Sequence, residues 1–135
     1  MRFLAIDLGD KRTGIAVGDD ELRMAQPVCV LEIPIGELLI NAILKTIEEQ
    51  GVDALVIGLP LNMDGTPGQR VVITKAFASN LEIATNMQLY FQDERLTSSA
   101  AEEKLSGSGK THKQKKKIRD ALAAAEILND FLAQL

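Results

Sequence analysis

Short apolar runs, some of them interrupted by turn residues, alternate along this chain with longer segments whose apolar residues recur at helical spacing. Three short apolar runs come first and predict strands over residues 2–8, 13–19 and 27–33. The tight turn "GDKR" separates the first two, and no helical pattern intervenes. We therefore expect the chain to open with an antiparallel meander.

The second half of the sequence alternates strands with helices. Apolar residues at helical spacing predict helices over 35–51 and 69–86, and apolar runs predict strands over 53–60 and 87–94. After these come a helix over 96–105, a mobile basic loop over 106–116 and a last helix from about Lys116 to the C-terminus. The order β-β-β-α-β-α-β-α-α requires parallel crossovers in its second half, so the sheet is mixed. We expect one α/β domain over residues 1–135.

Composition is that of an ordinary globular protein, with 46% hydrophobic and 25% charged residues. No apolar run approaches the roughly 18 residues that a membrane span needs. Asp7 interrupts the N-terminal apolar run, so the start lacks the pattern of a secretory signal and we expect a cytoplasmic protein with no membrane partner. The single cysteine, Cys29, lies in "PVCVLEI" and is predicted to be a buried core thiol rather than a nucleophile.

Positive charge is concentrated in one segment. The chain has a net charge of −4, yet residues 110–119 hold six basic residues and no acid. The remainder carries nine basic residues against 19 acids and so stands near −10. A local basic patch on an acidic body is suited to binding a polyanion at one place. A solvated, lysine-rich entrance to the last helix would give the same pattern, and charge alone does not separate the two.

Three acids occupy positions where a sheet of this kind gathers ligands. Asp7 and Glu94 stand at the carboxyl ends of two predicted strands, and ligands bind outside such ends. Asp120 lies one turn into the predicted last helix, at the flank of its apolar stripe. The small side chains of Ala123, Ala124 and Ala125 would let that helix approach the sheet, bringing Asp120 towards the strand ends.

Carboxylates that share a site repel one another, and a divalent cation relieves this cost. Carboxylate oxygens without cysteine or histidine suit magnesium or manganese better than zinc. Such a site can activate water against a phosphodiester. Taken singly, Glu94 could be an ordinary strand-end acid and Asp120 a first-turn helix acid. Asp7, directly after an apolar strand, is harder to explain as a surface residue.

Other residues are weaker candidates. Lys11 and Arg12 could neutralise a phosphate near Asp7 or simply occupy a hairpin turn, and the direction of Arg95 is open. Gly58 would permit close approach of the backbone at the rim of the sheet. His112 could assist a leaving group, although a solvated loop histidine is the more ordinary interpretation.

Four segments resemble the signature segments of the YqgF/RuvX family, in the same order and spacing. They are "AIDLGDKRTGIAVGD", "VIGLPLNMDGTPG", "DERLTS" and "KKKIRDALAAAEIL", and the resemblance covers nearly the whole chain. It implies the ribonuclease H-like fold, a mixed five-stranded sheet flanked by helices. It also implies that Asp7, Glu94 and Asp120 are catalytic and bind Mg²⁺ or Mn²⁺. Many nucleases of that fold use four acids; Asp10 is a weak candidate for the fourth, and Glu102 and Glu103 are weaker. The family has been described both as Holliday junction resolvases and as nucleases that mature the 5′ end of the small-subunit ribosomal RNA precursor.

We therefore expect a metal-dependent nuclease that processes the 5′ end of pre-16S ribosomal RNA. The alternatives are a resolvase acting on branched DNA and, from another class, a non-catalytic RNA-binding factor of ribosome assembly. The segment "DLGDKRTG" also resembles the phosphate loop of actin-like ATPases, but those enzymes need two such domains. A monomer and a homodimer both remain open. The predicted nucleic-acid contacts are Lys11, Arg12, Arg95, Lys110, Lys113, Lys115, Lys116 and Lys117.

Overall fold

One five-stranded sheet organises the protein. The structure, a computed structural model, describes residues 1–94 and 112–135, with the side chains of the second range described from Ile118 onward. Its strands are β1 (Arg2–Asp7), β2 (Thr13–Asp19), β3 (Ala25–Leu31), β4 (Ala54–Leu59) and β5 (Leu89–Asp93). Its helices are α1 (Glu37–Gln50), α2 (Gln69–Thr85) and α4 (His112–Ala133). The predicted helix over 96–105 lies outside the described residues.

The sheet is mixed, as the sequence predicts. Its strand order is β3-β2-β1-β4-β5. The β1–β2 and β2–β3 pairs are antiparallel, which confirms the opening meander. The β1–β4 and β4–β5 pairs are parallel, because a helix carries the chain back before each later strand. β1 therefore lies at the centre, flanked by the buried strands β2 and β4.

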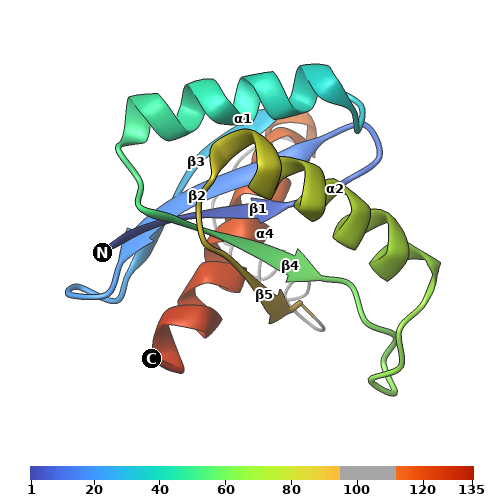
Figure 1. The fold of residues 1–135 in the computed structure, drawn as a ribbon. Coiled ribbons are helices and arrows are strands. Elements are labelled where there is room, and N and C mark those ends of the chain that lie inside the picture. Colours follow the sequence, from blue (N-terminus) through green and yellow to red (C-terminus); the bar gives the residue numbers. More distant parts are fainter. Residues whose placement is uncertain (95–111) are drawn as a thin grey trace.

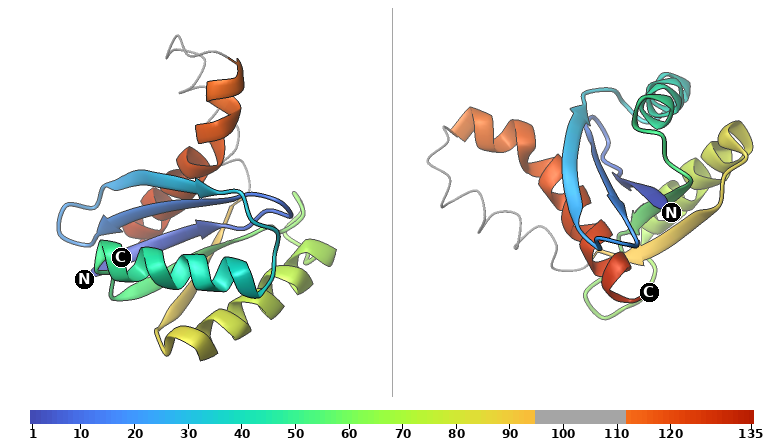
Figure 2. Two further views of the ribbon diagram at one scale, coloured as in Figure 1. Left: turned by 90° about the horizontal axis from the view of Figure 1, so that it is seen from above. Right: turned by 90° about the vertical axis from the view of Figure 1, so that its left-hand side faces the viewer.

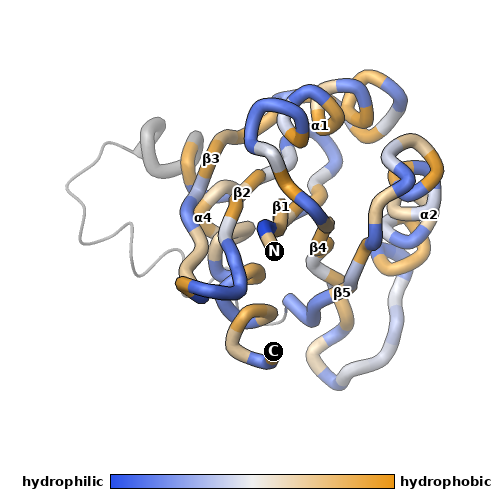
Figure 3. Tube along the Cα trace, turned by 60° about the vertical axis from the view of Figure 1, so that its left-hand side comes forward, coloured by the Kyte–Doolittle hydropathy of each residue, from blue (hydrophilic) through white to orange (hydrophobic). Residues whose placement is uncertain are grey.

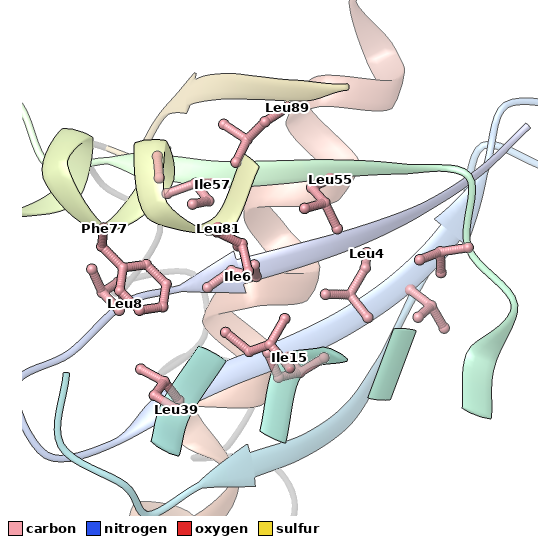
Figure 4. Close-up of a cluster of buried hydrophobic side chains, with 14 residues drawn as sticks. Leu4, Ile6, Leu8, Ile15, Leu39, Leu55, Ile57, Phe77, Leu81 and Leu89 are labelled. Carbon is pink, nitrogen blue, oxygen red and sulfur yellow. The ribbon is translucent and has the colours of Figure 1, made fainter. Parts of the chain in front are cut away.

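Helices cover both faces of the sheet (Figures 1 and 2). α1 and α2 lie on one face and α4 lies on the other. Alternate residues of β1 divide accordingly, since successive strand side chains point to opposite faces. Leu4 and Ile6 join the core under α1 and α2 (Figure 4). Phe3 and Ala5 join the core under α4.

The two helices on the first face end where the sequence expects them to end. Gly51 caps α1 in the left-handed conformation with φ 63°, and Asn86 caps α2 with φ 54°. Hydrophilic and hydrophobic segments alternate along both helices (Figure 3), as expected for helices with one face on the sheet. Among the described helices, none combines the length and apolarity needed to cross a membrane.

The last helix starts earlier than the sequence predicts. α4 begins at His112, so residues 112–116 are helical rather than the end of a basic loop. The first turns of α4 extend beyond the sheet (Figure 2). Lysine and glutamine are good helix formers, and they allow the helix to begin before its apolar stripe does. The predicted start at Lys116 was wrong because it took the onset of that stripe for the start of the helix.

Small residues bring α4 onto the sheet. Ala124 and Ala125 are buried against it, as predicted from the alanine triplet. The C-terminal part of α4 is anchored by Phe131, whose ring centroid lies 5.2 Å from that of Phe3 and 5.3 Å from that of Tyr90. The Asn129 side chain also accepts a hydrogen bond from the Ala25 amide, at 2.9 Å.

Cys29 departs from its prediction in part. It lies on β3, the edge strand of the sheet, and packs against the core under α1, but it is only half-buried. The edge position leaves one side of the strand without a neighbour. Burial, followed by the nearby Glu49 charge, raises the pKa of the thiol, so the group is less nucleophilic than an ordinary cysteine.

Candidate active site

The three predicted acids meet on the α4 face of the sheet, at the carboxyl end of β1. Asp7 is the last residue of β1 and follows Phe3 and Ala5 on that face. Glu94 comes directly after the last residue of β5. Asp120 is in the third turn of α4, because the helix begins at His112. The alternative of a first-turn helix acid is therefore wrong for Asp120.

Two glycines make room for these acids on either side of Asp7. Gly14 is the β2 partner of Asp7, and a Cβ there would collide with the Asp120 carbonyl and lie 2.8 Å from the Ala121 amide nitrogen. Gly14 thus lets the backbone of α4 pass directly over the strand. The sequence did not single out this position.

Gly58 makes room on the other neighbouring strand, β4. A Cβ at Gly58 would collide with the Glu94 carboxylate and lie 2.6 Å from the Ile127 Cδ1 atom. The expectation that this glycine permits approach of a backbone is therefore wrong. It leaves space for a carboxylate beside Asp7.

Asp7 and Glu94 interact directly through a hydrogen bond between their side chains. Burial raises the pKa of Asp7 far above its usual range, and the charge of Glu94, the hydrogen bond to it and the charge of Asp120 raise it further. Burial also raises the pKa of Glu94, while the bond to Asp7 and the charge of Arg70 oppose that shift. Two carboxylates that share a hydrogen bond cannot both ionise cheaply, so the pair favours protonation of Asp7, whose pKa is the more strongly raised.

Asp120 completes the cluster from α4. One of its oxygens, Oδ2, is buried and lies 3.3 Å from the Arg12 Nε atom, without the geometry of a hydrogen bond. Burial raises the pKa of Asp120, and Arg12 and Arg119 oppose that shift. The Asp120 charge acts on Asp7, and the same carboxylate forms an ion pair with Arg12, so it is shared between the acid cluster and the turn after β1.

The donor set fits a hard divalent cation. Three carboxyls converge, and burial raises the pKa of each of them, so a cation that compensates their charge would be bound favourably. In residues 1–94 and 118–135, however, no three such side chains are already arranged to hold a metal ion. The three carboxyls would therefore have to come closer together to hold one ion in common.

A pocket lined by charged residues of both signs adjoins the acids. Gly9, Asp10, Lys11, Arg12 and Asp120 line this pocket, which has a volume of about 530 Å³. Lys11 is exposed and Arg12 is half-buried, so both predicted phosphate-binding residues lie beside the acid cluster. Lys11 and Arg12 can therefore belong to the turn after β1 and also contact a phosphate at the site.

Arg70 is a site residue that sequence reasoning missed. It lies in the first turn of α2, and its guanidinium donates one hydrogen bond to the Asp10 carboxylate and another, of 3.2 Å, to the Leu8 carbonyl. Asp10, the weak candidate for a fourth acid, is thus bound to an arginine. A cation in the first turn of a helix opposes the helix dipole, and this was the one signal in the sequence that could have drawn attention to Arg70.

Several predicted site residues lie wholly or partly outside the part of the chain that the structure describes. Arg95, Glu102, Glu103 and Lys110 belong to residues 95–111. The backbone of Lys113, Lys115, Lys116 and Lys117 is part of α4, and His112 is its first residue, but their side chains are not described. Their roles stay predictions.

Comparisons with known proteins identify the family of this chain. Residues 1–134 match the protein family described as "RuvX: Holliday junction resolvase". The chain belongs to the RuvX family. A relative from Anaeromyxobacter sp. (strain Fw109-5), named "Putative pre-16S rRNA nuclease", is 40% identical over 132 residues, covering 98% of this chain and 96% of the relative. A relative of the same name from Maridesulfovibrio salexigens is 37% identical and covers 99% of each chain.

Solved structures confirm the ribonuclease H-like fold. This RuvX family chain resembles T. thermophilus RuvC in complex with a Holliday junction substrate, with a TM-score of 0.59 and 14% identity over 99% of this chain and 95% of that chain. It also resembles the fowlpox virus resolvase in complex with Holliday junction DNA, with a TM-score of 0.61 and 9% identity over 99% and 98%. At these identities the likeness concerns the fold alone.

Proposed function

We propose that this protein is a metal-dependent nuclease that hydrolyses a phosphodiester bond in the 5′ region of pre-16S ribosomal RNA. The observation that carries the proposal is the convergence of Asp7 and Glu94, hydrogen-bonded to each other, with the charge of Asp120 acting on Asp7 from α4. Family membership and the name of the relatives support the reaction and the substrate. A cytoplasmic location accompanies this proposal.

The three carboxylates would hold Mg²⁺ or Mn²⁺. Bound there, such an ion activates a water molecule and polarises the phosphodiester. The three donors are hard carboxylate oxygens rather than cysteine sulfur or histidine nitrogen, and such oxygens favour these ions over zinc. Titration of the protein with each ion measures which of the two binds more tightly and whether one or two ions are bound.

The remaining residues orient the substrate. Arg12 and Lys11 line the pocket beside Asp120, where a phosphate can approach both the acids and two cations. If Asp120 exchanged its ion pair with Arg12 for a bound cation, Arg12 could donate to a phosphate oxygen instead. Arg12 thereby stabilises charge on the phosphate that is being attacked.

Cleavage assays test the proposal directly. Precursor RNA carrying the 5′ end of 16S ribosomal RNA is incubated with the protein in Mg²⁺, in Mn²⁺ and in EDTA. We expect cleavage only with a divalent ion, and we expect Asp7→Asn to abolish it while circular dichroism shows a folded protein. Full activity of Asp7→Asn would remove the acid cluster from the mechanism.

A second candidate is resolution of branched DNA, which the description of the family favours. A four-way DNA junction is therefore assayed beside the precursor RNA under the same conditions. Cleavage of the junction alone would replace the RNA proposal with the resolvase. RNA binding without cleavage of either substrate would favour a ribosome-assembly factor.

A further inference from the structure

Arg70 joins α2 to the segment that follows β1. Its two hydrogen bonds reach the Asp10 carboxylate and the Leu8 carbonyl, so the guanidinium lies beside the strand end that carries Asp7. The two contacts use two of the five N–H donors of the side chain. The Arg70 side chain is 39% exposed, so the group is open to a ligand from solution.

The charge of Arg70 reaches the acid cluster. It lowers the pKa of Asp7 and of Glu94, against the larger effect of burial on both. The guanidinium therefore lies within electrostatic range of both acids.

Stability of the fold does not explain this placement. A cation in the first turn of α2 opposes the helix dipole. The partner, Asp10, is 74% exposed, and ion pairs of such exposed groups contribute little to stability. A contact of this kind is exchanged readily for another anion.

We propose that Arg70 binds a backbone phosphate of the polynucleotide substrate beside the acid cluster, and that Asp10 holds the guanidinium until this phosphate replaces it. Arginine suits the role because its planar fork donates two parallel hydrogen bonds to a phosphate. The inference rests on the proposed nuclease function and adds a residue of α2 to its substrate contacts.

Binding measured as a function of salt tests the proposal. The probe is a fluorescein-labelled RNA hairpin carrying the mature 5′ end of 16S ribosomal RNA and its leader, in EDTA, with its integrity checked on a gel. Fluorescence anisotropy gives the dissociation constant at several salt concentrations. The variants are Arg70→Gln, Arg70→Lys, Asp10→Asn and the double variant Arg70→Gln/Asp10→Asn. Lys75→Gln is the control, because Lys75 is an exposed cation of the same helix.

Loss of one phosphate contact has a defined signature. Arg70→Gln should bind several-fold more weakly, and its plot of log K against log salt should be shallower by about 0.7–0.9. Arg70→Lys should keep the slope of the unchanged protein, and Lys75→Gln should keep both slope and affinity. An unchanged slope in Arg70→Gln overturns the proposal, because a purely structural role leaves the number of phosphate contacts as it was.

The double variant tests the exchange with Asp10. Asp10→Asn should tighten binding several-fold when Arg70 is present, because the competing carboxylate is gone. In the Arg70→Gln background the same change should have a much smaller effect. An equal gain in both backgrounds would show that Asp10 acts by its charge on the substrate and not through Arg70.

These outcomes are separate from those of the nuclease proposal. If the unchanged protein cleaves the precursor and Arg70→Gln keeps its salt slope, only the role of Arg70 is lost. If the unchanged protein cleaves neither precursor nor junction in Mg²⁺ or Mn²⁺, the nuclease proposal fails, and the salt slopes still decide whether Arg70 contacts a phosphate.

Discussion

A carboxyl at the end of a central strand destabilises the folded protein when no cation is bound. Asp7 is packed between two neighbouring strands and under α4, and its pKa is raised mainly by burial and then by Glu94. A raised pKa means that the folded state binds protons more tightly than the unfolded state does. Stability of the metal-free protein therefore falls as the pH rises from about 4, the ordinary value for an aspartate, through the raised value.

Asp7→Asn removes this penalty. We expect the variant, in EDTA at pH 7–8, to be more stable than the unchanged protein, by about 1.4 kcal/mol for each unit by which the Asp7 pKa is raised. Below about pH 4 the two proteins should unfold alike, because Asp7 is then protonated in both states. Thermal unfolding from pH 3 to pH 8 measures the difference. The exposed acid Glu48, changed to Gln, is the control, and an advantage of Asp7→Asn that does not vary with pH would contradict the argument.

A second prediction for a single residue concerns Gly58. The atoms that a Cβ would meet are the ends of the Glu94 and Ile127 side chains, which can move, so Gly58→Ala should fold with a loss of about 1 kcal/mol. Displacement of Glu94 should weaken Mg²⁺ binding about 10- to 100-fold. Calorimetric titration with Mg²⁺ and urea unfolding measure the two effects. Unchanged Mg²⁺ affinity would exclude Glu94 as a ligand.

At the scale of elements, α4 determines whether the site exists. The helix places Asp120 over β2 because Gly14 has no side chain to hold it off and because Ala124 and Ala125 pack closely against the sheet. Phe131 anchors its other end on Phe3 and Tyr90. The distance between helix and sheet is thus set by residues that themselves have no chemical role.

Gly14→Ala should therefore differ from Gly58→Ala. Its Cβ would meet the backbone of α4 at Asp120 and Ala121, and a backbone in a packed helix cannot move alone. We expect a loss of about 3 kcal/mol in the free energy of unfolding, measured in urea, against about 1 kcal/mol for Gly58→Ala. Equal losses in the two variants would contradict the close approach of α4 to β2.

At the scale of the whole molecule, binding of a cation should be linked to folding. A ligand that binds only the folded state stabilises it by RT ln(1 + [L]/Kd), which is about 1.4 kcal/mol at a tenfold excess over Kd. The melting temperature should then rise with Mg²⁺ concentration in the unchanged protein and stay constant in Asp7→Asn. KCl at matched ionic strength controls for screening. An equal rise in both proteins would place the cation away from Asp7.

Much of the fold could be predicted from the order of patterns along the chain. The seven elements predicted before residue 95 are all present, with boundaries that differ by a few residues at most. Each is defined by local periodicity, and the two helices also end at a glycine or an asparagine. The start of α4 was missed because its first turns carry no apolar stripe.

The candidate site, too, could be predicted from the sequence only in part. Asp7, Glu94 and Asp120 could be proposed from the sequence, since a strand end and an alanine-rich helix face are local features. Only the tertiary structure decided that Asp7 and Glu94 share a hydrogen bond, that Arg12 approaches Asp120, and that Arg70 binds Asp10 across 60 residues of chain. Local patterns specify which face of an element is buried. Which charges meet depends on strand order and on how closely a helix approaches the sheet, and both are set by packing between residues far apart in the sequence.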